Sequence, residues 1–506
     1  MIPDFNGGAS AGELGPESHT WRLLKRAGQP NLKSVCSNLP LYWGPQPFTA
    51  GPMYIGAITI FLFLLGLLCC KGKERWWLLG ASLFAILLAL GHHFMPFTRL
   101  AFAALPLYNK FRTVSMALVI LQFTLPVLGF LALDSLVKGE IPGELFRRKG
   151  LAAWGLTGGI CLLFWLFPGL AGSFTGPSDQ GMQDVLVDAL VTDRMALLRH
   201  DAMISCLLVS AVFALLWWAL KPGDSAALKG RRITAAVAVC VLVLLDLMPV
   251  AKRYLNGSHF TTPKAFMDQF AKRPVDRAIL ADTDPSFRVL DLTVNVFNDS
   301  HPSYWHKNIG GYSPAKLQIY QEYIESHLQA EIRQLGASLQ GAKSLEEAAA
   351  AVPELEGLSK LNCRYIIVNG DASPLRYPYA RGNAWFEEPQ EGSFVEMTSY
   401  APNELRYRYS SPEEAKLVFS EVWYPVGWSL VVEDTGETLP MTLSDEVLRS
   451  VVVPAGEHVL VMRFAPSSYA RGAAVSRICS LLIILLALAA AAFALKGRSR
   501  KDIPAE

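Results

Sequence analysis

Charged residues are scarce in this sequence. They make up 18% of its 506 residues, and 46 basic and 44 acidic side chains leave a formal net charge of +2. A soluble domain usually has about 25% charged residues, and a domain that binds nucleic acid is usually strongly basic. The composition therefore excludes nucleic acid as a partner. Because 51% of the residues are hydrophobic, it favours an integral membrane protein with a sizeable soluble part.

Cysteine patterns and catalytic motifs are also missing. Six of the eight cysteines lie in apolar runs, and only Cys36 and Cys363 lie in polar segments. Their spacing matches neither a zinc site nor a disulfide framework. The sequence has no nucleophile elbow, no phosphate-binding loop and no metal-chelating motif. It therefore predicts no metal site, and the catalytic residues and any cofactor, such as a divalent cation, stay unknown.

What the sequence does have is long hydrophobic stretches. Crossing a bilayer as a helix takes roughly 20 apolar residues. Seven stretches qualify, at 53–70, 76–92, 113–137, 151–170, 202–220, 233–251 and 474–495. The third contains Gln122 and Pro126, and such residues inside a span usually face a protein interior or a cavity. We expect a six-helix membrane domain at 52–251 that encloses something, and a separate C-terminal transmembrane helix at 474–495.

Lysine and arginine follow every second span, at 71–75, 138–149, 221–232 and 496–501. The positive-inside rule places these segments, including the tail 496–506, in the cytoplasm. Residues 1–51 and 252–473 then lie outside the cytoplasm. The N-terminal segment 1–51 has no signal peptide, and a polar tail does not cross a membrane easily without a leading hydrophobic segment. We therefore expect the chain to be the C-terminal part of a longer protein.

Two stretches between the spans predict further helices. Residues 94–107 are too short to cross a membrane and are typical of an interfacial or re-entrant helix. Residues 178–201 carry apolar residues at helical spacing with aspartates between them, which predicts an amphipathic helix that leads into the fifth span. Its carboxylates either hold a divalent cation or a substrate hydroxyl, or form a solvated polar face with Asp–Arg pairs.

The large region after the sixth span divides in two. Residues 252–392 predict an extracytoplasmic α+β region, with strands at 287–292 and 363–369 and helices at 314–335 and 344–352. Residues 393–467 contain short strands separated by turn residues, which predicts an antiparallel β-sandwich. These strands lie at 405–409, 417–421, 429–432, 448–453 and 459–464. The predicted fold class is a multi-span α-helical membrane protein with an extracytoplasmic α+β region and a C-terminal antiparallel β-sandwich. Three tryptophans are expected to fill the sandwich core, with a carbohydrate-stacking surface as the alternative: Trp385, Trp423 and Trp428.

Six ordered blocks of sequence carry a resemblance. They are LYWGPQPFTAGPMYIG at 41–56, PLYNKFRTVS at 106–115, Asp246 with KRYLN at 252–256, GGY at 310–312, GNAWF at 382–386, and WYPVGW at 423–428 with LR and PAGEH downstream. Together they resemble YfhO-like bacterial membrane proteins, most of all the versions from Bacteroidetes, over nearly the whole chain.

The resemblance implies the GT-C architecture of multi-span glycosyltransferases that use a lipid-phosphate sugar donor. It implies a multi-pass protein of the bacterial cytoplasmic (inner) membrane, which transfers a sugar from a polyprenyl-phosphate donor to a glycan or glycopolymer acceptor of the cell envelope. In such enzymes a carboxylate in the first outer loop usually acts as base or metal ligand, and that loop belongs to the half expected to precede Met1. The alternative is a non-catalytic, membrane-anchored module for glycan binding or envelope assembly. A transporter is disfavoured because no inverted hydropathy repeat is present.

Cations near the outer end of the third span are candidates for binding the donor phosphate. The arginine fork matches phosphate oxygens, although a basic residue at a helix end can also anchor the helix among lipid headgroups. These candidates are Arg99, Lys110 and Arg112.

Two further groups are weaker candidates. Polar support is expected from Asp193, Arg194 and Asp246. Since an acid inside a membrane needs a partner, Asp246 is expected to pair with Arg112 or Arg194, and this pair is either functional or a structural link between helices. The residues Tyr42, Trp43 and Gln46 precede the first span, where aromatic residues either lie among headgroups or stack against a sugar.

Overall fold

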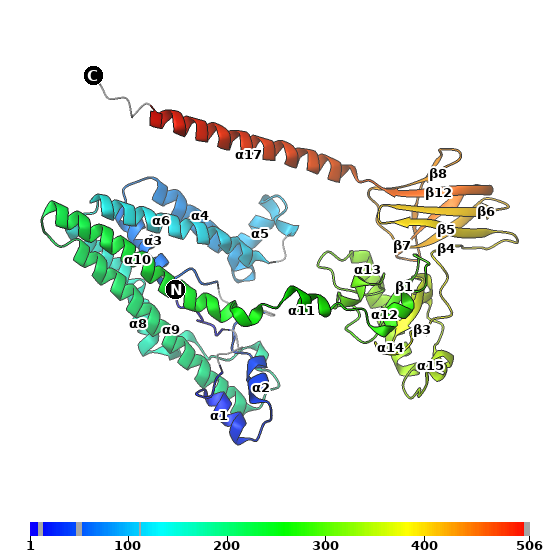
Figure 1. The fold of residues 1–506 in the computed structure, drawn as a ribbon, viewed down its shortest axis with the longest axis horizontal. Coiled ribbons are helices and arrows are strands. Elements are labelled where there is room, and N and C mark those ends of the chain that lie inside the picture. Colours follow the sequence, from blue (N-terminus) through cyan, green and yellow to red (C-terminus); the bar gives the residue numbers. More distant parts are fainter. Residues whose placement is uncertain (9–13, 47–52, 111–112, 500–506) are drawn as a thin grey trace. The chain divides into compact units, whose positions relative to one another are not determined.

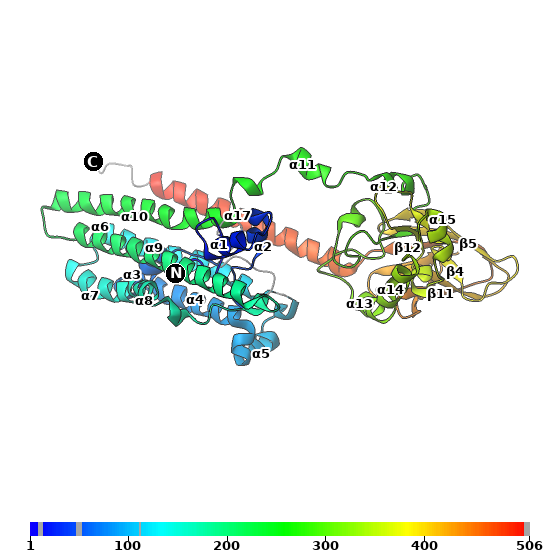
Figure 2. The ribbon, with the colours of Figure 1, turned by 90° about the horizontal axis from the view of Figure 1, so that it is seen from below.

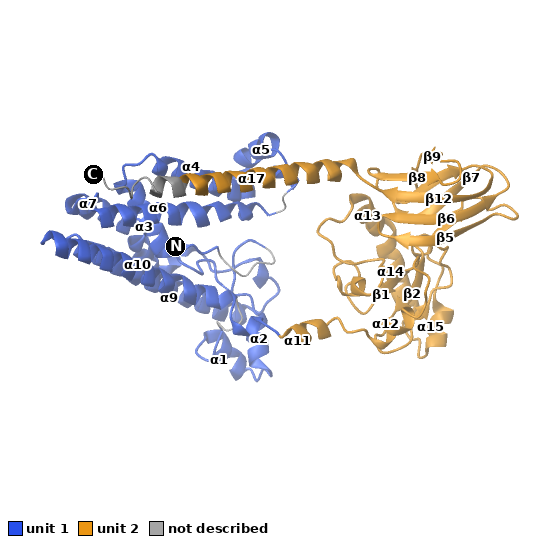
Figure 3. Cartoon of the chain, turned by 45° about the horizontal axis from the view of Figure 1, so that its top comes forward, with its two compact units in different colours: residues 1–261 blue, residues 262–506 orange. Residues whose placement is uncertain are grey.

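The chain folds into two compact units, residues 1–261 and 262–506 (Figure 3). The structure is a computed structural model, and it describes residues 1–8, 14–46, 53–110 and 113–499, with side chains as far as 493. The first unit is helical (Figure 1). The second unit contains three β-sheets with short helices, and it ends in one long helix.

The helices of the first unit follow the hydropathy of the sequence. They are α1 (His19–Arg26), α2 (Leu32–Asn38), α3 (Ala57–Cys69), α4 (Glu74–Leu90), α5 (Met95–Ala104), α6 (Val119–Lys138), α7 (Gly143–Gly155), α8 (Gly158–Leu166), α9 (Asp184–Ala219) and α10 (Ser225–Tyr254). The amphipathic helix predicted at 178–201 begins only at Asp184, and it continues into the fifth span as one helix, α9, of 36 residues.

Six helical stretches of the described chain are long and apolar enough to cross a membrane. They are Glu74–Ala104, Val114–Lys138, Gly143–Leu166, Asp184–Ala219, Ser225–His259 and Ser467–Phe493. They correspond to the last six predicted spans. The chain thus has the helices of a multi-pass membrane protein.

The first predicted span, 53–70, is shorter in the structure than expected. Helix α3 has 13 residues, and a helix of that length measures about 20 Å, less than the ~30 Å of hydrocarbon in a bilayer. Residues 53–56 are not helical, and Gly56 enters α3 with a φ of +99°. Hydropathy counts these apolar residues toward the span, but it does not report their backbone conformation.

Helix α3 lies in the middle of the first unit, because α4, α6, α7, α9 and α10 all contact it. Its residues Ala57, Ile58, Phe61 and Leu65 are fully buried. The approach of α6 is close enough that a Cβ atom at Gly66 would lie 2.7 Å from the Leu128 carbonyl oxygen. Small residues at such contacts let helix backbones pack tightly in membrane proteins.

The basic connections between the helices meet at one end of the first unit. A Cβ atom at Gly139 would lie within 2.2 Å of Arg232 Nη1, which places the α6–α7 connection beside the start of α10. The Sγ atom of Cys70, which follows α3, lies 4.0 Å from Ser135 Oγ near the end of α6. Figure 2 shows α9 and α10 running side by side to this end. The segments 71–75, 138–149 and 221–232 therefore share one end, as the positive-inside argument requires.

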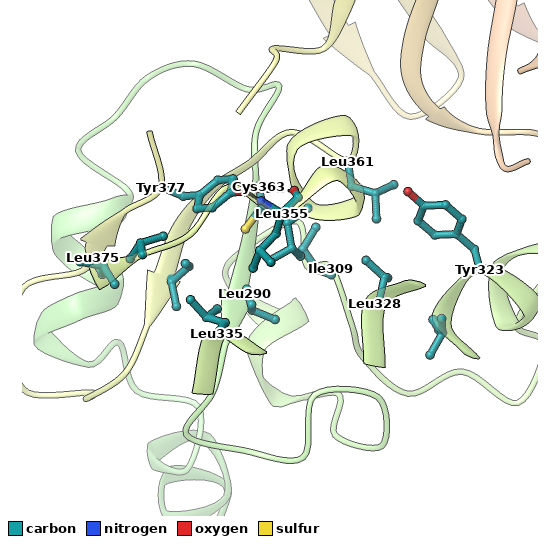
Figure 4. Close-up of a cluster of buried hydrophobic side chains, with 14 of the residues drawn as sticks. Leu290, Ile309, Tyr323, Leu328, Leu335, Leu355, Leu361, Cys363, Leu375 and Tyr377 are labelled. Atoms are coloured by element: carbon teal, nitrogen blue, oxygen red, sulfur yellow. Dashed lines mark hydrogen bonds between the residues drawn. The ribbon is translucent and has the colours of Figure 1, made fainter. Parts of the chain in front are cut away.

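The second unit opens with an α/β part. Strand β1 (Arg288–Asp291) pairs in parallel with β2 (Cys363–Ile367), and β2 pairs antiparallel with β3 (Leu375–Arg376). Its helices are α11 (Pro263–Asp268), α12 (Pro274–Ile279), α13 (Gln318–Tyr323), the π-helical turn η8 (Ile324–Leu328), α14 (Gln329–Ser338), α15 (Leu345–Ala351) and α16 (Glu356–Lys360). Side chains such as Leu290, Leu328 and Leu335 form its core (Figure 4).

The predicted elements of the α/β part are present, with shifted boundaries. The helix predicted at 314–335 begins at Gln318 because the residues around Pro314 form a turn, in which the Ala315 N–H donates to Ser313 Oγ. The parallel pairing of β1 with β2 was not predicted.

Two antiparallel sheets follow. One has the strand order β10-β11-β7-β4 and the other β5-β6-β12-β8-β9. The strands are β4 (Ala384–Phe386), β5 (Phe394–Ala401), β6 (Glu404–Ser411), β7 (Ala415–Val422), β8 (Trp428–Val432), β9 (Thr438–Leu439), β10 (Thr442–Ser444), β11 (Leu448–Val453) and β12 (Gly456–Phe464). The strands predicted from 405 to 464 correspond to β6, β7, β8, β11 and β12. Helix α17 (Ser467–Ser499) then contains the last predicted span.

Both antiparallel sheets contribute side chains to one hydrophobic cluster, for example Phe419 from β7 and Tyr407 from β6. Trp428 lies half-buried at the edge of this cluster, with the Arg449 Cζ atom 4.0 Å from its ring centroid. Trp385 packs instead against the core of the α/β part, so its predicted place in the sandwich core is wrong. Trp423 is half-buried.

Candidate functional site

The first unit contains an apolar groove between α3, α6 and α10. Its volume is ≈ 510 Å³, within the range of ligand-binding pockets. It follows α6 from Gln122 to Leu133, a distance of about 16 Å at the rise of an α-helix. The groove is lined by Tyr54, Ile55, Thr59, Leu62, Gln122, Pro126, Gly129, Phe130, Leu133, Val239, Cys240, Val243, Leu244 and Leu247.

The lining meets one expectation from the sequence in part. Gln122 and Pro126, which interrupt the third predicted span, both line this groove, but Gln122 is exposed and does not face an enclosed interior. The groove opens on the outside of the bundle as well, since Phe130 and Leu244 are 62% and 59% exposed. We refer to this cavity as the α3–α6–α10 groove.

A buried carboxylate lies behind one wall of the α3–α6–α10 groove. Asp246 of α10 is 4% exposed. It accepts a hydrogen bond from the Tyr54 hydroxyl and another, of 3.1 Å, from the backbone N–H of Ile58. The Tyr54 hydroxyl also accepts a bond of 3.0 Å from the Ala57 N–H. Asp246 and Tyr54 therefore cap the first turn of α3, where free N–H groups and the helix dipole favour a negative charge.

This arrangement excludes Arg194, one of the two expected arginine partners of Asp246. Arg194 is fully buried and forms a bidentate pair with Asp179, with distances of 2.8 and 2.7 Å. Its remaining donors bond to the carbonyl oxygens of Leu41, Phe174 and Pro40. Arg112, the other expected partner, lies outside the described residues.

The charge of Arg194 also acts on its partner. Burial alone would raise the pKa of the Asp179 carboxyl, but the hydrogen bonds from Arg194 and from the Gly176 N–H hold this pKa below its ordinary value. The Asp179 carboxylate therefore stays ionised, and its pair with Arg194 ties the loop before α9 to the helix itself. Asp–Arg pairing was the structural alternative for the carboxylates of 178–201, and for Arg194 it is what the structure shows.

Asp193 has a structural role of the same kind. Its two carboxylate oxygens accept hydrogen bonds of 2.8 Å from the backbone N–H groups of His19 and Thr20, in the first turn of α1. Asp193 therefore fixes the N-terminal helix to α9. Neither Asp193 nor Arg194 lines the α3–α6–α10 groove.

A third polar cluster was not predicted from the sequence. Arg253 of α10 binds both oxygens of Asp201 at 2.7 Å and one oxygen of Asp4 at 2.6 Å. Tyr254 donates to the other oxygen of Asp4. Both acids are almost fully buried. The partners are up to 250 positions apart in the sequence, so no local pattern could have indicated this cluster.

The remaining predicted residues lie on the surface or in packing contacts. Arg99 on α5 and Lys110 are exposed and lie outside the groove lining. The Trp43 ring packs on Phe174 with centroids 5.2 Å apart, and Tyr42 is half-buried. Gln46 is exposed.

Within the described residues, no group of three or more His, Cys, Asp or Glu side chains is placed to hold a metal ion. The candidate site of the first unit is the α3–α6–α10 groove, which can accept an apolar chain and has the Tyr54–Asp246 pair at one wall. No family model, curated protein or solved structure matches the chain.

Proposed function

We propose that the chain belongs to a multi-pass bacterial membrane protein type, YfhO-like and of the GT-C class, which transfers a sugar from a polyprenyl-phosphate donor to a cell-envelope acceptor outside the cytoplasm. The α3–α6–α10 groove carries this proposal. Its lining is almost entirely apolar and it follows a membrane-length helix, so it fits the hydrocarbon chain of a lipid donor. Tyr54, Thr59 and Gln122 place polar groups in its wall.

The arrangement of the basic connections supports the proposed orientation. Segments 71–75, 138–149 and 221–232 meet at one end of the first unit, and the positive-inside rule assigns that end to the cytoplasm. Helix α6 starts at the opposite end, so Arg99 and Lys110, which precede it, belong to the outer side together with the Tyr54 end of the groove. Their exposed cations are available for a donor phosphate there. The two antiparallel sheets of the second unit form, in this proposal, an outer β-sandwich that faces the acceptor.

A groove-filling variant tests this proposal. Cys240 lines the groove from α10 and is exposed, so Cys240→Trp fills the groove without disturbing the buried core. The matched control is Val237→Trp, which adds the same ring at a 61% exposed position of the same helix outside the lining. We expect a photoreactive polyprenyl phosphate to label wild type and Val237→Trp in membrane vesicles, and to label Cys240→Trp at least tenfold less. Equal labelling of all three proteins would contradict the assignment of the groove.

Transfer itself needs a separate measurement. Cells that produce the protein with Arg99→Ala, Lys110→Ala or Arg112→Ala should lose envelope glycosylation if these cations hold the donor phosphate. Unchanged glycosylation in all three variants would contradict the proposed phosphate site.

A second candidate function is a membrane-anchored module for glycan binding or envelope assembly. It is favoured by the carboxylates of the first unit, since Asp193, Asp201 and Asp246 all bond to groups that hold the fold together. Binding of envelope glycan by the purified chain, without transfer from a polyprenyl-phosphate sugar, would favour this function over glycosyl transfer.

A further inference from the structure

The second unit begins with a patch of partly exposed apolar and aromatic side chains. They come from α11 and the residues after it, and from the 3-10 helix η7 (His301–Tyr304) with Trp305. Phe266, Met267 and Tyr304 are 52%, 51% and 47% exposed. Phe270 and Trp305 are half-buried beneath them. We call these five residues the aromatic patch.

The aromatic patch is a fixed surface rather than a set of separate side chains. The Phe270 and Tyr304 rings stack with centroids 4.5 Å apart, and Phe266 packs edge-on to Phe270 at 5.6 Å. Two hydrogen bonds join the segments that carry these rings. Trp305 Nε1 donates to the Phe270 carbonyl oxygen at 2.9 Å, and His301 Nε2 lies 2.6 Å from the Gln269 carbonyl oxygen.

Positive charge flanks the aromatic patch. Lys264 on α11 and Lys272 are exposed, and the Lys272 Nζ atom lies 4.5 Å above the Trp305 ring. Asp268 is the one acid between them in the sequence. Aromatic rings with lysines beside them are typical of the headgroup region of a membrane, where the rings enter the interface and the cations meet lipid phosphates.

The position of the patch in the chain indicates which surface it meets. The membrane-length stretch Ser225–His259 ends just before it, and only residues 260–262 separate His259 from the start of α11. Phe260 in this connection is 70% exposed. Since the four steps from His259 to Pro263 extend by about 14 Å at most, α11 starts close to the end of that stretch.

We propose that the aromatic patch, with Lys264 and Lys272, docks on the anionic phospholipid headgroups at the outer end of the span 225–259. This inference rests on the proposed membrane placement of α10. The docking holds the first segment of the second unit at the membrane surface, where a lipid-linked substrate of the groove would present its headgroup. A patch made for a second protein copy or for free glycan would not need cations next to the end of a span.

Depth-dependent fluorescence quenching of the full chain in lipid vesicles tests the proposal. The exposed cysteines among the described residues, Cys240 and Cys479, are first replaced by serine. Single cysteines then carry a fluorophore at three positions: Phe266→Cys in the patch, Val237→Cys in the span, and Val452→Cys on β11, which is 50% exposed. The vesicles contain phosphatidylcholine, 30% phosphatidylglycerol as the anionic lipid (about one lipid in three), and nitroxide-labelled lipid as quencher.

Each outcome has a distinct meaning. We expect quenching at 237 and at 266 and none at 452. Quenching at 237 without quenching at 266 would overturn the docking proposal and leave the membrane placement intact. Loss of quenching at 237 would overturn the membrane placement and the docking proposal with it.

The charge of the lipid gives a second test. One lysine near an anionic membrane changes the docking equilibrium by about fivefold. In vesicles with phosphatidylglycerol, Lys264→Ala and Lys272→Ala should each lower the ratio of quenched to unquenched label at 266 by that factor. In pure phosphatidylcholine the two variants should match wild type. Equal quenching of wild type and variants in both kinds of vesicle would overturn the role of anionic lipid.

Discussion

Replacing Asp246 by leucine tests whether α3 depends on its capping carboxylate. Leucine keeps the apolar packing of α10, but it leaves the Tyr54 hydroxyl and the Ile58 N–H without their acceptor. An unsatisfied buried donor costs about 1–3 kcal/mol, whereas hydrogen bonds inside membrane helix bundles contribute about 0.6 kcal/mol on average. The removal of a desolvated charge offsets part of the loss. We therefore expect a net loss of about 2 kcal/mol.

The assay is the midpoint of thermal unfolding of the purified chain in detergent. For a unit of this size a loss of about 2 kcal/mol lowers the midpoint by roughly 4–8 °C. Asp246→Asn keeps one acceptor oxygen and should lose about half as much. Asp134→Ala is the control, because Asp134 is 53% exposed in its pair with Lys138, and it should leave the midpoint unchanged.

A double-mutant cycle decides whether Tyr54 and Asp246 interact as the geometry indicates. The variants are Tyr54→Phe, Asp246→Leu and the two combined. We expect a coupling energy of about 0.6–1.7 kcal/mol, the range seen for hydrogen bonds between membrane helices. Effects that add to within about 0.3 kcal/mol, together with an Asp246→Leu variant that unfolds at the wild-type temperature, would refute the capping role.

Three further predictions follow from packing and charge. Gly66→Val should destabilise the first unit by about 1–3 kcal/mol, since its Cβ atom would approach the Leu128 carbonyl oxygen within 2.7 Å; an unchanged unfolding midpoint would contradict the close α3–α6 contact. Arg253→Ala should cost about 3–5 kcal/mol because two buried acids lose their shared partner, while Lys252→Ala, at the exposed neighbouring position, should have no effect on the same midpoint. Burial alone would raise the pKa of Asp276, but hydrogen bonds from Arg273 and His306 lower it to about 2. The ionised Asp276 carboxylate therefore stabilises the folded state fully above pH 3.8, its ordinary pKa, and this stabilisation is lost as the pH falls toward 2. When the free energy of unfolding is measured as a function of pH, wild type should lose about 2 kcal/mol of it as the pH falls toward 2, and Asp276→Asn should not. Equal acid sensitivity of the two proteins would contradict this pKa.

The sequence predicts what depends on local pattern and misses what depends on pairing across the chain. Hydropathy and helical spacing locate the long helices, and they join the amphipathic segment before Asp201 to the fifth span. Alternation and turn residues locate the longer strands. Such patterns cannot predict the cluster of Arg253 with Asp4 and Asp201, because its members share no periodicity and come from three separate segments.

In the candidate site, too, local pattern predicts some features, and partners that are distant in the sequence decide the others. Gln122 and Pro126 indicate a groove from within one hydrophobic run, because polar or kinked residues inside a predicted span usually line a protein surface or a cavity. The partner of Asp246 could not be found in this way. The search for an opposite charge leads to an arginine, but the acceptor is satisfied by a phenol and a backbone N–H, groups that every sequence contains in abundance.

The late start of helix α3 and the burial of Asp246 depend on each other. If residues 53–70 formed a continuous helix, the Ile58 N–H would bond to the Tyr54 carbonyl oxygen four residues earlier, and it would have nothing to donate to Asp246. Because the chain is not helical from 53 to 56, the first N–H groups of α3 are free to bind the buried carboxylate of Asp246. The same non-helical segment brings Tyr54 and Ile55 into the wall of the α3–α6–α10 groove. A substitution that extends α3 toward its N-terminus, such as Gly56→Ala, should therefore disturb the acid and the groove together. Loss of polyprenyl-phosphate labelling with a lowered unfolding midpoint is the expected result, and loss of only one of the two would show that the groove and the cap are independent.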